Sequence, residues 1–558
     1  MMIKPQSVVF LIITILIFLF LNLDGIYYQS ESDTVFPAYI FGYYSSGVNA
    51  LPITFGCFSY LGSLMNFIFV FKGMDTILYD GFQIVLVILS ISSCSYILFL
   101  KQSEFSILNV ILVLVFSILL IDFFRPFEFS KTSFIVTFLG LLLYYDNKKK
   151  PISYLLIILG FLIRPESATI VYLIYIFYYS FIKTKDFNLN TIYQTFKCHF
   201  PLLVLFLVMS LSINIPFNNE DAYYKKIRPY EYSLSDFDIK DFDTKYLKEK
   251  SSIKIFAAKN FFYADSSKIN VAFFNENSII PRDKTPFSIL ISLANFSDFF
   301  FKNTFALNFI KSVSAYLVFG ALMILFFLYF KDFRFIIFIL SCTALNMFLV
   351  FYFKPEFHFI TPIFCITYLL CFQKFHHHIL SLDKIKKVSV LFLMVGFGSI
   401  QIFAFQKELL DDSKRKHSFY SRILEHVENN PSKNIMINIS VWDNFHWKLF
   451  GKIKPINHDE VIVVDGGILY ISAAYQNKMR QITNEKTFDK QFLKISSKEK
   501  LQIYTSKKRM RLLLDYMYLV YGVNIDLKPV KCFGYFENTD TNNIIYIYEL
   551  KKNKFNVY

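Results

Sequence analysis

Residues 152–183 read ISYLLIILGFLIRPESATIVYLIYIFYYSFIK, and this stretch decides the fold. Two apolar runs, 152–163 and 168–183, flank one charged turn made of Arg164, Pro165 and Glu166. Each run is long enough, or nearly long enough, to cross a bilayer as a helix. Pro165 explains the break between them, because proline interrupts a helix. The stretch therefore predicts two membrane helices joined by a charged turn at one surface.

Similar apolar runs extend on both sides of this stretch. Only 18% of the 558 residues are charged and 54% are hydrophobic, which is unlike an ordinary soluble domain. We expect an α-helical polytopic membrane protein with about eleven transmembrane helices. The first run is expected to remain as an uncleaved helix, because no small-residue cleavage site follows it. The runs are 7–23, 82–100, 105–121, 132–145, 152–163, 168–183, 200–215, 308–330, 333–353, 357–373 and 387–404.

Lysines predict the orientation of these helices. One further run, 52–71, is ambiguous. If it lies on the outer surface, the clusters that include Lys148 to Lys150 and Lys374 to Lys387 face the cytoplasm, as does Lys4. The N-terminus is then cytoplasmic. The outer segments are 24–50, 122–131, 164–166, 216–305, 354–358 and the chain after 405.

The tail, residues 406–558, is expected to be a separate extracytoplasmic α/β domain, and residues 1–405 the membrane domain with outer loops 24–50 and 216–305. About 150 residues are enough for an independent core. The sequence predicts strands in IMINIS (435–440), EVIVVDGG (460–467) and NIIYIYEL (543–550), and a helix over 505–521.

Three carboxylates follow the first apolar run directly, at Asp24, Glu31 and Asp33. A carboxylate near hydrocarbon is costly and is rarely kept there without a partner or a task. The alternative is that these side chains only cap and solvate a helix end. The loop is therefore the first candidate for chemistry.

Several segments together resemble membrane glycosyltransferases of the GT-C fold, in particular arabinofuranosyltransferase-like and protein-O-mannosyltransferase-like bacterial proteins. The shared features are the acidic outer loop, the surface helix after it, the Arg-Pro-Glu turn and EFHFITPIF (356–364). SDTVFPAYIFGYYSSG (32–47), IRPYEYSLSDFD (227–238) and FFYADSS (261–267) are similar to patterns in bacterial cell-surface membrane proteins. The resemblance covers about residues 1–400.

The resemblance implies an inverting enzyme of the bacterial inner membrane. Its donor would be a polyprenyl-phosphate sugar, and its acceptor a cell-surface glycan or lipid. Asp33 is at the position of the family's catalytic acid, and Glu31 is the second choice for the base that deprotonates the acceptor. This chain has Asp33-Thr34 where relatives tend to show adjacent acids, which leaves open which carboxylate is the base.

The departing lipid phosphate needs cationic groups. Arg164 is expected to hold it through charge-assisted hydrogen bonds, with Arg228 and His358 as further candidates. His358 stands where many such enzymes have an arginine. The alternative for Arg164 is a salt bridge that ties two helix ends. Supporting residues are Glu166, Asp236, Asp265 and Asp122, and Asp122 with Arg125 and Glu128 fits a structural network equally well.

Other classes of membrane protein predict a different distribution of charged residues or a different use of the tail. A glycan polymerase or ligase with a lipid-diphosphate donor would use the same face, whereas a transporter or flippase predicts acids on both sides and pseudo-symmetric halves. A non-catalytic assembly protein would bind a partner through its tail. Nucleic acid is not expected despite the net charge of +15, because no compact basic domain is visible. No metal ligands are assigned, and a divalent ion at the site is left open.

The orientation can be tested with reporter fusions after Lys150 and after Tyr558. We expect a cytoplasmic signal at Lys150 and an extracytoplasmic signal at Tyr558, because only this parity keeps the lysine clusters inside. A cytoplasmic signal at Tyr558 would contradict both the orientation and the assignment of the outer loops.

Overall fold

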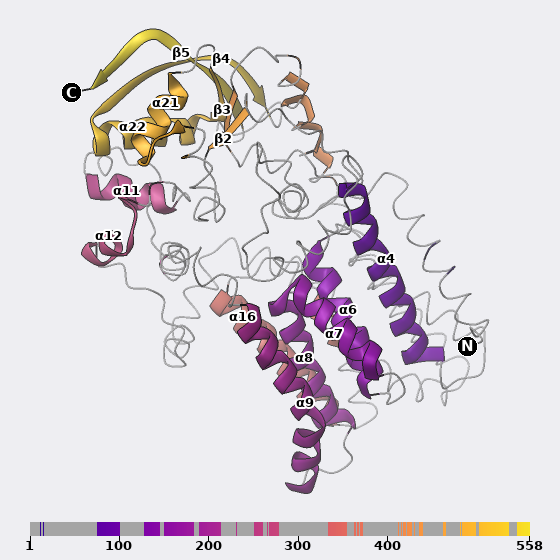
Figure 1. The fold of residues 1–558 in the computed structure, drawn as a ribbon. Coiled ribbons are helices and arrows are strands. Elements are labelled where there is room, and N and C mark those ends of the chain that lie inside the picture. The colour runs from indigo at the N-terminus through magenta and orange to yellow at the C-terminus, as the bar shows by residue number, and fades with distance from the viewer. Residues whose placement is uncertain are drawn as a thin grey trace.

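Figure 1 shows the computed structural model of the chain. The residues that the structure describes are 75–100, 128–145, 150–183, 189–213, 250–259, 265, 267–277, 333–353, 435–438, 461–464, 483–497, 501–534 and 544–557, with 12, 15, 230, 480 and scattered positions in 362–371 and 411–429. The predicted runs 105–121, 308–330 and 387–404, and nearly all of 7–23, lie outside them.

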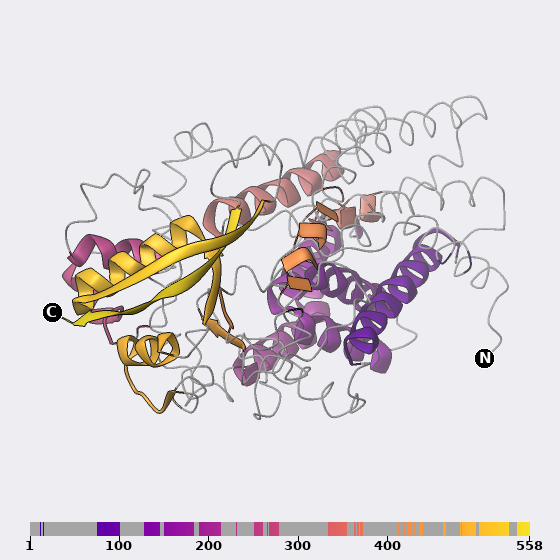
Figure 2. The ribbon, with the colours of Figure 1, turned by 90° about the horizontal axis from the view of Figure 1, so that it is seen from above.

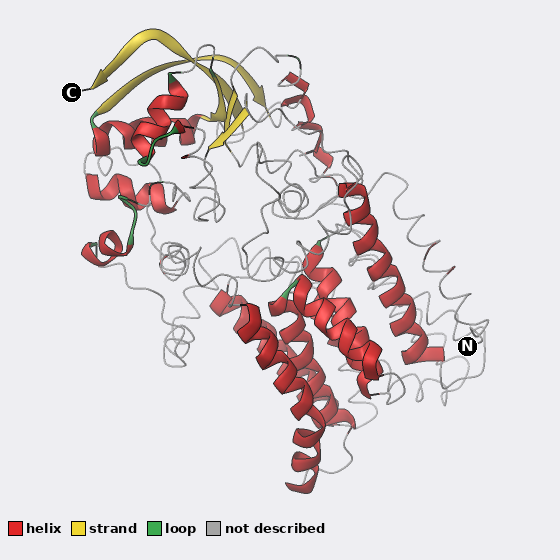
Figure 3. Cartoon of the chain, viewed as in Figure 1, coloured by secondary structure: helices red, strands yellow, loops and turns green. Residues whose placement is uncertain are grey.

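The described apolar segments form a helical bundle, and six of the predicted runs coincide with its helices. The helices are α4 (Asp75–Ser95) with its π-helical continuation η1 (Tyr96–Leu100), α6 (Phe129–Tyr145), α7 (Lys150–Ile163), α8 (Pro165–Tyr178) with the π-helical η3 (Tyr179–Lys183), α9 (Leu189–Ile213) and α16 (Phe333–Phe353). Figure 3 shows them gathered away from the strands. Their buried apolar side chains form one continuous core.

Helix α6 lies at the centre of this core. All of its side chains except Leu143 and Tyr145 are buried, as expected for a helix that is apolar on every face. It approaches α7 closely because small residues meet there. A Cβ built on Gly160 would lie 2.1 Å from Oγ1 of Thr137, and one on Gly140 would lie 2.8 Å from Cγ1 of Ile157. Glycine is therefore required for the close packing of these two helices.

The bundle buries many polar side chains and exposes many apolar ones. Buried hydroxyl and amide side chains come from several of its helices, namely Ser90, Ser92, Ser95, Thr132, Ser133, Thr137, Ser153, Ser167 and Asn346. The most exposed apolar side chains include Val85, Leu155, Phe200, Leu207, Val208, Phe333 and Leu340. A helix at a water-exposed surface normally has the opposite arrangement.

The length and composition of the helices give a weaker indication that the bundle lies in a membrane. Among the described residues, one helix, Leu78–Leu98, is long and apolar enough to cross a membrane. Shorter apolar helices in the same part of the chain are Phe129–Tyr145, Pro151–Ile163, Phe196–Met209 and Phe333–Asn346. The expected total of about eleven spans stays a prediction.

The tail contains a five-stranded mixed sheet in the order β2-β1-β3-β5-β4. Its strands are β1 (Ile435–Asn438), β2 (Val461–Val464), β3 (Gln502–Ser506), β4 (Val523–Gly534) and β5 (Ile544–Val557). β1 pairs in parallel with β2 and β3, and β5 pairs antiparallel with β3 and β4. β4 is an edge strand, which tolerates Pro529 beside a register shift.

Two helices accompany the sheet, and the longer one runs alongside β4 and β5 (Figure 2). They are α21 (Phe488–Ser496) and α22 (Lys507–Tyr521). Ser506 caps α22 by accepting a hydrogen bond from the Arg509 backbone N–H, and Gly522 ends it at φ 72°. The sequence placed the start of this helix at 505. The helix starts later because residues 502–506 pair with β1 and β5 as β3.

A segment from the predicted loop 216–305 packs against this tail. Helix α11 (Lys250–Lys259) lies beside α22, and α12 (Val271–Glu276) follows it (Figure 1). Ile253, Phe256 and Ala257 of α11 are buried. The loop and the tail therefore share a core, although they are far apart in the sequence.

The close packing of α6 on α7 leads to a stability prediction. Gly160→Ala should destabilise the protein by about 1–3 kcal/mol, because the added methyl group meets Thr137. Among the described residues the Thr137 hydroxyl has no hydrogen-bond partner, so Thr137→Ala removes the clash without breaking a hydrogen bond. Thermal unfolding in detergent should show that the double variant recovers part of the loss. Strictly additive losses would contradict this account of the contact.

Candidate functional site

The junction between α7 and α8 positions Arg164. Pro165 is the first residue of α8, where its missing N–H breaks no helical hydrogen bond, and Arg164 before it is extended at φ −156°. The Arg164 backbone N–H donates to the Gly160 carbonyl oxygen at 3.0 Å. The Ser133 hydroxyl from α6 donates to the carbonyl oxygens of Gly160 at 2.7 Å and Arg164 at 3.0 Å. The backbone that carries the guanidinium is therefore fixed to α6.

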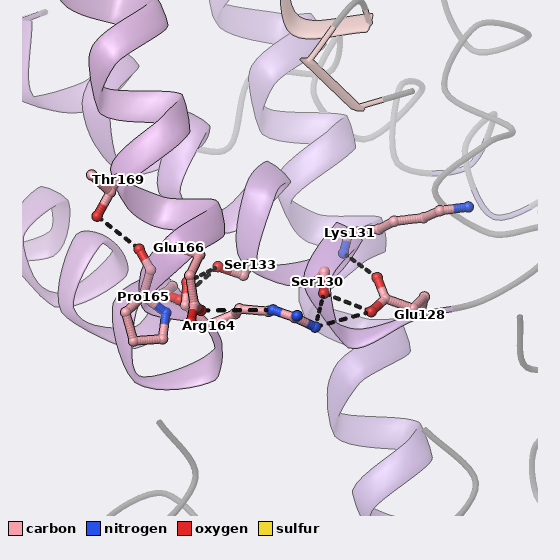
Figure 4. A network of polar contacts seen from close by, with 9 residues as sticks. Glu128, Ser130, Lys131, Ser133, Arg164, Pro165, Glu166 and Thr169 are labelled. Atoms are coloured by element: carbon pink, nitrogen blue, oxygen red, sulfur yellow. Dashed lines mark hydrogen bonds and ion pairs between the residues drawn. The ribbon is translucent and has the colours of Figure 1, made fainter. Parts of the chain in front are cut away.

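The guanidinium of Arg164 reaches across to the start of α6 (Figure 4). Its Nη1 donates to Ser130 Oγ at 2.6 Å and lies 3.5 Å from Glu128 Oε1. Its Nε lies 3.7 Å from Glu166 Oε2. The guanidinium carbon is 4.9 Å from the centre of the Phe129 ring, within the range of a cation–π contact. We call Glu128, Ser130, Arg164 and Glu166 the Arg164 cluster.

The two carboxylates of the cluster differ in their surroundings. Glu128 is fully buried, and it accepts hydrogen bonds from Ser130 Oγ at 2.6 Å and from the Lys131 backbone N–H at 3.3 Å. It also lies at the start of α6, where the helix dipole favours a negative charge. The side chain of Glu166 is 58% exposed, so its contact with Arg164 is screened by solvent. The sequence predicted a salt bridge between Arg164 and Glu166 as the alternative to phosphate binding. The structure shows both contacts, and the buried partner of Arg164 is Glu128.

Further polar side chains meet at the same end of the bundle. Thr132 Oγ1 donates to Gln83 Oε1 on α4 at 3.2 Å, and Asp80 on α4 is buried. Lys131 is buried as well, and its side chain extends away from the Glu128 carboxylate (Figure 4). These polar side chains thus gather where the starts of α6 and α8 meet the end of α7 and the first turns of α4.

Asp265 belongs to a different network. Its carboxylate accepts hydrogen bonds from Tyr516 and Tyr521 of α22, so it is joined to the tail and not to the Arg164 cluster. Burial, together with the nearby Asp265 carboxylate, raises the pKa of Tyr521. The sequence grouped Asp265 with Arg164 as a supporting residue. The described contacts do not bring the two together.

The other predicted site residues lie outside the described part of the chain, namely Glu31, Asp33, Asp122, Arg228, Asp236 and His358. Arg164 and Glu166 are the only predicted members that the described structure brings together. Within the same described ranges, no group of three or more His, Cys, Asp or Glu side chains could hold a metal ion.

A second polar cluster, made of Tyr145, Tyr172 and His199, joins α6, α8 and α9. Tyr145 Oη lies 2.5 Å from His199 Nδ1, and Tyr172 Oη donates to the His199 carbonyl oxygen at 3.1 Å. The Tyr145 ring stacks on Tyr175 with centroids 4.8 Å apart. The sequence analysis did not predict this cluster, because tyrosines are frequent throughout the apolar runs. Its position between three packed helices indicates a role in holding the bundle together.

Compared with models of known protein families, with curated proteins and with solved structures, the chain matches none. Glu128 is buried and occupied by donors, so it is not placed to take a proton from a substrate. The Arg164 side chain is 24% exposed, and a guanidinium is the side-chain group best suited to a phosphate or carboxylate.

The burial of Glu128 predicts that the two carboxylates contribute unequally to stability. Glu128→Gln should lower the free energy of unfolding by about 1.5–3 kcal/mol, because it removes a buried charge that Arg164 and Ser130 compensate. Glu166→Gln should change it by no more than about 0.5 kcal/mol, because that side chain is mostly in solvent. Thermal unfolding of both variants in the same detergent measures this. Equal losses would contradict the assignment of Glu128 as the main partner.

Proposed function

We propose that the chain is a membrane glycosyltransferase of the GT-C type. It moves a sugar from a polyprenyl-phosphate donor to a cell-surface glycan or lipid acceptor. The observation that carries the proposal is Arg164, a partly exposed arginine whose guanidinium contacts buried Glu128 at one end of the bundle. A lipid-linked phosphate needs such a place, where a fixed cation meets an apolar surface.

The distribution of side chains supports a location in a bilayer. Leu207 and Val208 on α9 and Leu155 on α7 are among the most exposed apolar residues, whereas Thr137 and Asn346 are buried. Hydrocarbon can cover such an apolar outer surface, and the polar side chains of membrane helices face the inside of their bundle. In this proposal the Arg164 end faces away from the cytoplasm, as the lysine pattern predicts, and the membrane is the inner membrane of a bacterium.

The proposed reaction inverts the configuration at the anomeric carbon of the sugar. Asp33, or Glu31 in its place, takes the proton of the acceptor hydroxyl, and the acceptor oxygen attacks the anomeric carbon. The bond from that carbon to the phosphate oxygen breaks, and its electron pair leaves with the polyprenyl phosphate. Arg164 stabilises the negative charge that develops on the phosphate. Glu128 keeps the guanidinium in place throughout.

The rival account is that Arg164 only ties α6 to the α7–α8 junction. Its contacts with Glu128 and Ser130 support this account as well, because they join two helix ends. The two accounts differ in what happens to donor binding when the arginine is changed.

The test is a transfer assay with purified protein and a polyprenyl-phosphate sugar. Arg164→Ala should raise the apparent donor constant by about 10–100-fold, because a charge-assisted hydrogen bond to phosphate contributes about 1.5–3 kcal/mol. Arg164→Lys should have a smaller effect, because it keeps the charge and loses the planar fork.

Glu166→Gln is the matched control, since it removes a charge next to Arg164 that is mostly in solvent. It should leave the donor constant unchanged. If Arg164→Ala lowers thermal stability but the remaining folded protein binds donor as the wild type does, Arg164 is a structural residue and the phosphate role is wrong.

A further inference from the structure

The carboxylate of Asp265 is buried and accepts hydrogen bonds from three hydroxyl groups. Asp265 is 1% exposed. Its Oδ1 accepts a hydrogen bond from Ser267 Oγ at 2.6 Å, and its Oδ2 accepts hydrogen bonds from Tyr516 at 2.7 Å and from Tyr521. A buried carboxylate that accepts several hydrogen bonds is costly to leave without a donor.

The two tyrosines come from the other end of the chain. They follow Asp265 by 251 and 256 residues, and both lie on α22 of the tail. The predicted runs between 308 and 404 separate them from the loop. The contact therefore closes a very long loop and holds two outer segments together.

Aromatic contacts flank this network in the tail, and a cation–π contact reaches it from the loop. Tyr516 packs edge-on against Phe488 of α21 and against Tyr521. The Lys268 ammonium lies 5.7 Å from the centre of the Tyr521 ring. Figures 1 and 2 both show α11 next to α22. Asp265 is thus the polar centre of an interface between the loop and the tail.

The two loop helices contact each other, because the Lys254 ammonium of α11 lies 5.2 Å from the centre of the Phe273 ring of α12. On α12, Phe274 stacks with Tyr230 at 4.8 Å between ring centres, and the Tyr230 hydroxyl donates to Asn275 Oδ1 at 3.0 Å. The backbone carbonyl of Asp265 accepts from Ile269 N at 2.9 Å, which fixes the turn leading into α12. A change at Asp265 would therefore reach both the turn and the interface.

We propose that Asp265 is a latch, a positioning residue that docks the loop helices α11 and α12 on the tail, so that loop and tail move as one body. Its task is to position these segments, and it does not react with a substrate. The inference is independent of the proposed transfer reaction. It gives the tail a function, because a ligand that moves the tail also moves the loop.

Hydrogen–deuterium exchange on the full-length protein tests the latch. Asp265→Asn should speed amide exchange by about tenfold or more in both 250–277 and 507–521, because the loss of a buried charge-assisted network lowers the free energy of local opening. Tyr521→Phe, which removes one hydroxyl, should give the same pattern with a smaller change. Exchange in α6, α7 and α8 should stay as in the wild type.

Asp526→Asn is the matched control, because Asp526 is exposed on β4. It should leave exchange in 250–277 unchanged. Faster exchange confined to 265–277 in Asp265→Asn would show that Asp265 only shapes its own turn, and would overturn the proposal. Unchanged exchange with loss of transfer activity would also overturn it, since that result assigns Asp265 to the chemistry.

Discussion

The contact between Arg164 and buried Glu128 is the interaction on which the described bundle and its proposed chemistry both depend. It joins the start of α6 to the junction of α7 and α8, and Ser133 fixes the same junction through two carbonyl oxygens. A guanidinium held on one side by a buried carboxylate has a defined direction in space. The exposed part of Arg164 can therefore serve as a fixed cation at the edge of an apolar bundle.

The distribution of polar and apolar side chains indicates what kind of ligand could reach Arg164. Polar groups from α4, α6, α7 and α8 gather at one end, and the outer surfaces of α7, α9 and α16 are apolar. Such an arrangement suits a substrate with a charged head and a hydrocarbon tail. Asp265 joins the tail to the loop that carries α11 and α12, and in the proposed function both lie on the side of the membrane where the acceptor binds.

Local patterns in the sequence predicted many of the described helices. Contacts between residues far apart in the sequence could not be predicted from such patterns. The apolar runs 132–145 and 333–353 coincide with α6 and α16, because a hydrophobic run is a local signal. Strands β3 and β4 were not predicted, since the partner of both, β5, lies further along the chain. The partners of Arg164 and Asp265 lie 36 and 251 residues away, so neither spacing nor composition reveals them.

The central claim is that Arg164 holds the phosphate of a lipid-linked donor. A cryo-EM structure of the full-length protein in lipid nanodiscs with a bound polyprenyl-phosphate sugar tests it most directly. The account predicts a phosphate oxygen about 3 Å from the Arg164 guanidinium, with Glu128 still on its other side and Asp33 facing the same cavity. A donor phosphate bound elsewhere, with Arg164 in contact only with Glu128, Ser130 and Glu166, would contradict it.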